Sequence, residues 1–283
     1  MGLVKKMRRK YEEIRPKYEH LVNDLLDIRD SFLGRRDGLI PPRNEIFVGR
    51  STIKQYKKIG EGLLKQFIEL GGLQPSDCVL DVGCGQGRIA LPLTRFLNGG
   101  GSYEGFDIVP KGITWCQKKF TPRHPNFRFQ LADVRNRCYN PAGGVEAPEY
   151  TFPYPDAEFD FIFLTSVFTH MYPPAMLRYL SEIARTLKPG RRCLITWFLL
   201  NDKSRALMAA DKSVINFRYP LENCFTSVPE RPEDALAFDE GYVRDSYRRT
   251  GLRIEGIYYG RWSGREKWLP GQGQDIVVAS KPA

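Results

Sequence analysis

The stretch that decides the fold is VLDVGCGQGRIA at residues 79–90. It begins as an apolar strand, passes through glycines at the alternate positions 83, 85 and 87, and continues into a helix. Glycine adopts φ values that side chains disfavour, and it lets the backbone approach a ligand closely at the carboxyl end of a strand. The stretch therefore predicts a cradle for a nucleotide cofactor, although a glycine run alone is also typical of an ordinary strand-to-helix turn.

The spacing of these glycines indicates the kind of cofactor. A dinucleotide fingerprint reads G-x-G-x-x-G, whereas here the glycines alternate and Asp81 stands two residues before the first of them. A carboxylate repels pyrophosphate but attracts an ammonium group, such as that of the methionine part of S-adenosylmethionine. In this motif the chain resembles the class I S-adenosylmethionine-dependent methyltransferases. The resemblance implies cofactor contacts from Asp81, Gly83, Cys84, Gly85 and Gly87.

Two further acids follow in the order that this resemblance requires. Residues 102–108 predict a strand that carries Asp107 about 20 residues after the last glycine, the position from which a carboxylate accepts both ribose hydroxyls. Residues 127–134 predict a strand with Asp133 near its end, and the resemblance places that acid at the adenine amino group. Each acid alone is typical of a solvated strand end or a helix N-cap, but together they favour a cofactor site. The resemblance adds Ile108 and Val134 near the base.

Strands and helices continue to alternate in the second half of the chain. Residues 159–166 predict a fourth strand, and the resemblance places Thr165 and Ser166 at its end, beside the cofactor. The later predicted elements are a helix that opens at Pro173 and ends before Pro189, a strand at 191–200, a helix at 242–250 and strands at 252–262 and 274–280. The last two strands predict an antiparallel pair, because a polar, glycine-containing loop separates them. We expect an α/β, Rossmann-like class I methyltransferase fold, a seven-stranded, mostly parallel sheet with an antiparallel last strand, over residues 56–281.

Residues 1–55 predict an N-terminal helical extension or lid on a methyltransferase domain of residues 56–283. Its apolar residues follow the three-four spacing of an amphipathic helix, which Pro16 should kink. These residues are Val4, Met7, Tyr11, Ile14, Tyr18, Leu21, Leu25 and Ile28. Two arrangements are open, a helix pair across a homodimer and a lid helix packed on its own domain, and we favour the second.

Two other segments depart from the alternation. Residues 135–157 are too rich in Pro and Gly to form a regular helix. Residues 201–240 follow the fifth strand, where related methyltransferases carry substrate-binding insertions, and long loops in compact domains are often functional. We expect this substrate-cap insertion to bring Arg205, Arg218 and Tyr219 toward the carboxyl edge of the sheet.

The candidate catalytic residue is His170, which lies just after the fourth predicted strand. An in-line methyl transfer to a neutral hydroxyl needs a group that removes the proton as the new bond forms. Imidazole changes charge near neutral pH and suits this task. The alternatives are a structural histidine that caps the following helix and one that only orients the substrate.

Composition agrees with an α/β enzyme. The 283 residues are 42% hydrophobic and 27% charged, which fits one domain with appendages. The six cysteines form no C-x-x-C pair and no cluster with histidine, so neither a metal site nor a disulfide framework is predicted, and a reducing cytoplasm is expected. No apolar run approaches the ~20 residues that span a bilayer.

The net charge is +10, but the basic residues are spread along the chain. Neither an RNA-binding module nor the motifs of adenine-N6 or cytosine-C5 methyltransferases are present, so nucleic acid is not the predicted partner. An anionic acceptor, or an anionic membrane face where such acceptors are assembled, suits the charge.

The sequence therefore predicts an S-adenosylmethionine-dependent O-methyltransferase that acts on a sugar or a small polar metabolite. The motifs resemble those of bacterial methyltransferases of polysaccharide and secondary-metabolite synthesis. Three alternatives stay open: N-methylation of an amino sugar, RNA methylation, and a cofactor-binding regulatory protein without turnover.

Overall fold

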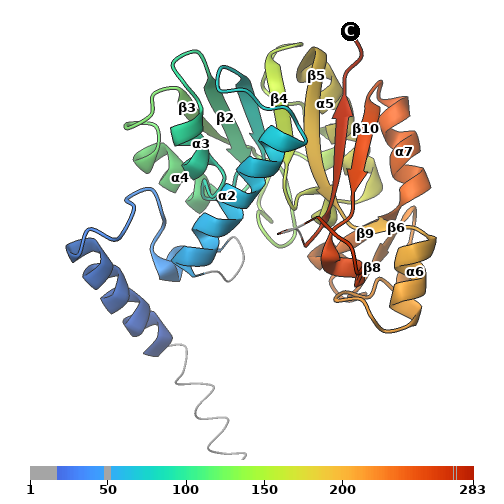
Figure 1. The fold of residues 1–283 in the computed structure, drawn as a ribbon, viewed down its shortest axis with the longest axis horizontal. Coiled ribbons are helices and arrows are strands. Elements are labelled where there is room, and N and C mark those ends of the chain that lie inside the picture. The colour runs from blue at the N-terminus through green and yellow to red at the C-terminus, as the bar shows by residue number, and fades with distance from the viewer. Residues whose placement is uncertain (1–17, 48–51, 270, 272) are drawn as a thin grey trace, which may run out of the picture.

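A seven-stranded sheet forms the centre of the computed structural model, which describes residues 18–47, 52–269, 271 and 273–283 (Figure 1). Its order is β10-β11-β5-β4-β1-β2-β3. The strands are β1 (Cys78–Val82), β2 (Ser102–Asp107), β3 (Phe127–Leu131), β4 (Phe159–Leu164), β5 (Leu187–Trp197), β10 (Arg253–Tyr258) and β11 (Asp275–Ser280). The strands from β5 to β3 are parallel, and β11 is antiparallel to both β5 and β10. The predicted fold class is confirmed, including its antiparallel last strand.

Helices cover both faces of this sheet. The helices α2 (Ile53–Glu69), α3 (Ala90–Phe96) and α4 (Pro110–Lys119) share one core, and α5 (Pro173–Thr186) and α7 (Glu240–Arg249) belong to the other. Strands buried on both faces must be apolar on both, which explains the apolar run at residues 161–164 of β4. In the first core, the ring centroids of Phe67 and Phe163 are 4.4 Å apart, and in the second those of Phe168 and Trp197 are 4.7 Å apart.

The predicted boundary between the helix at Pro173 and the fifth strand is wrong. The helix before the fifth strand ends at Thr186, and β5 begins at Leu187 rather than at residue 191. The strand begins earlier because of a tertiary contact: Leu187 is fully buried and pairs with Phe159 of β4. The amide of Gly190 donates to the carbonyl of Lys281 at 2.8 Å, so the Pro-Gly turn signal lies inside a paired strand.

The residues after β5 fold into a small second sheet. Its order is β6-β9-β8-β7, with β6 (Leu199–Leu200), β7 (Tyr219–Leu221), β8 (Cys224–Thr226) and β9 (Leu236–Asp239), and α6 (Asp202–Ala209) lies beside it (Figure 1). Buried Asp275 joins this sheet to the main one, since its carboxylate accepts hydrogen bonds from the amide of Leu199 at 2.8 Å and from Trp262 Nε1 at 2.7 Å. The predicted insertion is thus an ordered subdomain.

The N-terminal extension contains a helix over residues 18–32 that projects from the body of the molecule (Figure 1). The prediction that its apolar stripe packs on the same domain is wrong for the described residues, because Tyr18, Leu21, Leu25 and Ile28 are exposed. The predicted kink at Pro16 lies outside the described residues. No helix in the described part of the chain is both long and apolar enough to cross a membrane.

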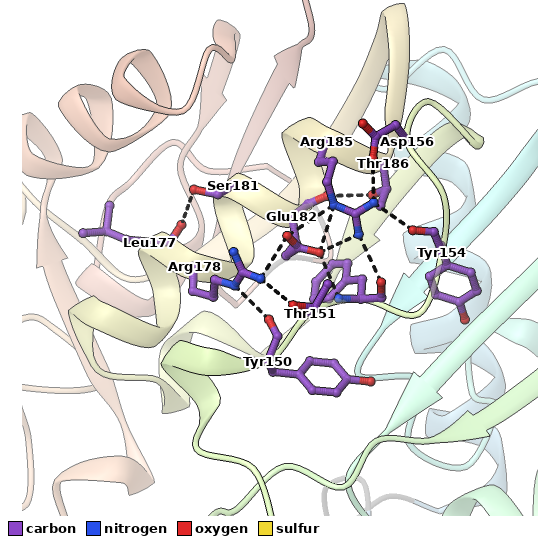
Figure 2. Close-up of polar contacts among 11 residues, drawn as sticks. Tyr150, Thr151, Tyr154, Asp156, Leu177, Arg178, Ser181, Glu182, Arg185 and Thr186 are labelled. Atoms are coloured by element: carbon purple, nitrogen blue, oxygen red, sulfur yellow. Dashed lines mark hydrogen bonds and ion pairs between the residues drawn. The ribbon is translucent and has the colours of Figure 1, made fainter.

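The Pro- and Gly-rich segment between β3 and β4 is irregular but firmly held. The guanidinium of Arg185 on α5 donates to the carbonyl of Phe152 at 3.0 Å and to that of Tyr154 at 2.8 Å, and Figure 2 shows the bond to Tyr154. Buried Glu182 accepts from the Phe152 amide at 2.9 Å, and Arg178 Nε donates to the Tyr150 carbonyl at 3.0 Å. Charged side chains of α5 therefore satisfy the backbone groups that a helix or sheet would otherwise pair.

Candidate active site

A cavity of about 350 Å³ lies at the carboxyl ends of β1, β2 and β4. This is the edge at which open α/β sheets bind ligands. Most of the sequence-predicted residues line it, namely Gly83, Cys84, Gly85, Asp107, Ile108, Val134, Thr165, Ser166 and His170. Segments far apart in the sequence therefore meet at one cavity.

The glycine loop leaves this cavity open. Gly83 has φ +86°, and a Cβ atom there would lie 2.4 Å from Val167 Cγ2. Gly87 does not line the cavity but has φ +77°, and a Cβ atom there would lie 2.8 Å from the Phe120 ring. The first glycine thus allows the turn at the cavity, and the last allows α4 to pack behind it.

Asp107 ties the end of β2 to the glycine loop. Its Oδ2 accepts the Gly85 amide at 2.7 Å, and its Oδ1 accepts the Val109 amide at 2.9 Å. Burial raises the pKa of this carboxyl, and the two backbone N–H groups oppose that shift. The carboxylate is therefore held in a fixed orientation on the cavity wall, as a group that binds two hydroxyls must be.

Asp81 lies beneath the loop rather than at the cavity. It is fully buried, and its Oδ2 accepts a hydrogen bond from the Tyr103 hydroxyl at 2.7 Å. Burial raises the pKa of Asp81 to about 8. This shift favours the protonated carboxyl at neutral pH, and the contact with an ammonium group that the sequence suggested stays a prediction.

We expect Asp81 to make the stability of the protein depend on pH. The native carboxyl keeps its proton up to about pH 8, whereas the unfolded one releases it near its ordinary pKa of 3.8. Between these values the native state binds more protons, so the free energy of unfolding should fall as pH rises, by at most about 1.4 kcal/mol per pH unit. Urea unfolding across this range should show a flatter pH dependence for Asp81→Asn. The exposed-site variant Asp245→Asn should keep the wild-type slope, and equal slopes in all three proteins would contradict the assignment.

Other predicted residues also lie away from the cavity. Asp133 is exposed, and its Oδ1 accepts the Gly144 amide at 3.1 Å. In the substrate-cap insertion, Arg205 pairs with Asp239 at 3.4 Å and stacks on Phe225. Arg218 and Tyr219 are exposed on the same subdomain. The contacts predicted for these four residues stay predictions.

The structure adds cavity residues that no sequence motif marked. Phe47 of the N-terminal extension lines the cavity, and its amide donates to Gln86 Oε1 at 3.0 Å. Gln86 Nε2 donates in turn to the Glu45 carbonyl at 2.9 Å. Gln86 lies between two glycines of the motif, at a position to which the motif assigns no residue type, so no sequence signal predicts its two hydrogen bonds to the extension. Further wall residues are Arg88, Arg135, Asn136, Tyr139, Met171 and Tyr179.

Replacing Gln86 by leucine should release the extension from the glycine loop. Two hydrogen bonds are lost, so we expect the free energy of unfolding to fall by about 1–3 kcal/mol and cofactor affinity to fall with the displaced Phe47. Thermal unfolding and titration calorimetry measure the two effects. Gln130→Leu, an exposed change on β3, is the matched control. Unchanged affinity in the Gln86 variant would show that the extension does not contribute to the cavity.

His170 is fixed by a contact from the small subdomain. Its Nδ1 lies 2.8 Å from the carbonyl oxygen of Glu233, which can only accept a hydrogen bond. Nδ1 of the neutral ring therefore carries the proton, and Nε2 keeps the lone pair. The ring of Tyr139 meets the imidazole edge-on at a centroid distance of 6.2 Å. This tautomer suits a proton acceptor.

Ser166 is held at the same wall in an unusual backbone conformation. Its φ is +60°, a value that costs energy for a residue with a Cβ atom. The amide donates to Thr196 Oγ1 at 2.7 Å, and Gln274 Nε2 donates to Ser166 Oγ at 2.9 Å. The turn after β4 is thus held by hydrogen bonds to Thr196 of β5 and to Gln274, which directly precedes β11.

Comparison with known proteins agrees with this fold. Residues 79–190 match the family described as "Methyltransferase domain". A phthiotriol/phenolphthiotriol dimycocerosates methyltransferase of Mycobacterium tuberculosis is 35% identical over 44% of this chain and 37% of its own length. The 27-O-demethylrifamycin SV methyltransferase of Amycolatopsis mediterranei is 28% identical over 65% of both chains. The chain thus spans little more than a third of the mycobacterial relative.

Solved structures show the same fold. A methyltransferase from Clostridium acetobutylicum superposes with a TM-score of 0.52 and 13% identity, over 93% of this chain and 100% of that one. The fold and the cavity define a class I, Rossmann-like nucleotide-cofactor domain. The match over residues 79–190 and the fold are those of the class I S-adenosylmethionine-dependent methyltransferases, so S-adenosylmethionine is the expected cofactor. The glycine cradle, which a Cβ atom would fill, and the oriented Asp107 fit that cofactor.

Proposed function

We propose that the protein transfers the methyl group of S-adenosylmethionine to a hydroxyl oxygen of a small acceptor, with His170 as the general base. The observation that carries this proposal is the hydrogen bond from His170 Nδ1 to the Glu233 carbonyl. It leaves Nε2 as the acceptor nitrogen of a side chain on the cavity wall.

The cofactor supplies an electrophilic methyl group on a sulfonium when bound. The chain orients the cofactor and the acceptor and provides a proton acceptor. The glycine loop and Asp107 would hold the adenosine part at the ends of β1 and β2. His170 Nε2 takes the hydroxyl proton as the oxygen attacks the methyl carbon. The ring becomes an imidazolium, whose Nδ1–H bond to the Glu233 carbonyl is retained. A bound cofactor would give its methyl group to the acceptor oxygen and be left as a thioether, and His170 would hold the hydroxyl proton.

The walls of the cavity suggest the class of acceptor. Tyr139 and Phe47 offer aromatic faces, and Arg135 offers a cation that also pairs with Glu146 at 3.2 Å. These groups support a small polar acceptor with several hydroxyls, such as a sugar or a secondary metabolite, and an anionic group would suit Arg135. The names of the two curated relatives describe methylation of a triol compound and of a rifamycin. The name of the second supports transfer to oxygen.

N-methylation is the second candidate, since an amine with a lone pair needs no strong base. RNA methylation would need an affinity for RNA that falls steeply as the salt concentration rises. The test is methyl uptake from radiolabelled S-adenosylmethionine with paired hydroxyl and amino versions of the same nucleotide sugars, oligosaccharides and polyketides. Labelling of the hydroxyl compounds supports the proposal. Labelling confined to the amino compounds contradicts it, and release of no thioether product with any acceptor favours a regulatory protein.

A further inference from the structure

The helix over residues 18–32 turns its polar face toward the rest of the chain. Asn23 Nδ2 donates to Asn44 Oδ1 at 2.9 Å, and Arg43 pairs with both Asp27 and Asp30. Apolar side chains normally face the protein and charged ones face water. This helix has the reverse orientation.

The segment that the helix contacts is itself fixed to the methyltransferase domain. Asp37 pairs with Arg95 of α3 at 3.0 Å, and Trp115 Nε1 of α4 donates to the Leu39 carbonyl at 3.3 Å. Leu39 and Ile40 are buried in the core on that face of the sheet. The polar face of the helix is therefore anchored, and its apolar face points away.

The apolar face is a continuous exposed stripe. Tyr18, Leu21, Leu25, Ile28 and Phe32 repeat at alternate steps of three and four, and they are 64%, 56%, 58%, 67% and 90% exposed. This is the a/d repeat of a coiled coil, with Leu21 and Ile28 at the d positions. Large contiguous apolar surfaces are uncommon on monomers and mark interaction sites.

Charge distinguishes the occupants that such a stripe could accept. A helix that lies on an anionic membrane carries Lys and Arg on its polar face, whereas this one carries Asp24, Asp27 and Asp30. Asp24 and Arg29 flank the stripe on opposite sides, at positions g and e of the repeat. Within the chain Asp24 accepts a hydrogen bond from Asn44 Nδ2 at 2.8 Å and Arg29 pairs with Asp30 at 2.7 Å, so pairing between copies would extend these contacts. In a parallel pair, position g faces position e five residues further along the partner, so each Asp24 meets an Arg29, and two-fold symmetry forms the pair twice.

We infer that the stripe of Tyr18, Leu21, Leu25, Ile28 and Phe32 is the interface of a homodimer, in which the helix pairs in parallel with that of a second copy of this chain. This is the first of the two arrangements that the sequence left open. The methyltransferase domains attach to the outer, polar faces of the pair.

Sedimentation equilibrium of the full chain tests the inference. The wild type should be a dimer, and Leu25→Glu should raise the dimer dissociation constant at least about 100-fold, because two carboxylates would face each other in an apolar interface. Leu25 is exposed in the single chain, so circular dichroism of the variant should match the wild type. Val214→Glu is the matched control, an equally exposed apolar site at 70% on the small subdomain, and it should remain dimeric.

Cysteine cross-linking tests the orientation. In a Cys138→Ser background, which removes the exposed native thiol, Leu21→Cys and Ile28→Cys should each form a disulfide across the dimer, since d positions face their own counterparts in a parallel pair. An antiparallel pair would cross-link at one of the two sites at most and would overturn the inference. A monomeric wild type, a dimer that survives Leu25→Glu, or a monomer that sediments with anionic phosphatidylglycerol vesicles would also overturn it.

Discussion

Replacing His170 by alanine is expected to lower kcat by about 10²–10⁴-fold, the range typical of a lost general base. Cofactor affinity should change little, because the adenosine part is predicted to bind at the ends of β1 and β2. The structural basis is the Nδ1 bond to the Glu233 carbonyl, which presents Nε2 as a proton acceptor. Single-turnover methyl transfer and calorimetric titration of S-adenosylmethionine measure the two quantities separately.

Two variants make this result specific. His170→Gln keeps a polar group of similar reach but cannot take a proton at neutral pH, so it should be as slow as the alanine variant. His124→Ala changes a histidine that is only half-buried beside Phe127 and should retain wild-type turnover. If His170→Gln restores activity, the side chain orients the acceptor instead of accepting its proton. Full activity in His170→Ala would favour an amine acceptor.

Replacing Asp107 by alanine should weaken cofactor binding by about 100-fold or more. Hydrogen bonds to a charged group contribute about 1.5–3 kcal/mol each, and the change removes the bonds to the Gly85 and Val109 amides as well as those predicted to the ribose. The glycine loop would lose its fixed position at the same time. Calorimetry with S-adenosylmethionine and with its demethylated product should show similar losses, because both carry the ribose.

The control for this prediction is Asp245→Ala, which removes a carboxylate from the exposed face of α7. Asp107→Asn adds a finer test. Its amide oxygen can still accept one backbone N–H, but its NH₂ group would face the other N–H and cannot accept a hydrogen bond from it. Its affinity should fall between those of the wild type and Asp107→Ala. Unchanged affinity in Asp107→Ala would contradict the ribose assignment.

The candidate site could be predicted from the sequence where it depends on chain order. Glycines after a strand, and Asp107 at the end of the next, must meet at the carboxyl edge of a parallel sheet, because right-handed crossovers bring each strand end to that edge. His170 follows the fourth strand and reaches the same edge. These placements need no knowledge of side-chain packing.

Burial and side-chain direction were not predictable in the same way. Asp81 matched the motif, but the packing of β1 between β2 and β4 takes its carboxyl out of solvent and raises its pKa. Asp133 also matched, yet its oxygen turns to the Gly144 amide. A motif fixes the position of a Cα atom on the fold, whereas solvation depends on neighbours distant in sequence.

The sequence by itself determined the α/β class, the antiparallel last strand and the cavity at the glycine loop, because hydrophobic period and turn residues act locally. Only the tertiary structure decided that Gln86 clasps Phe47 over the cavity and that Glu233 sets the tautomer of His170. It also decided which face of the helix at residues 18–32 is exposed. An amphipathic pattern shows that a stripe must be covered, but the ion pairs of Asp27 and Asp30 with Arg43 turn that stripe away from its own domain.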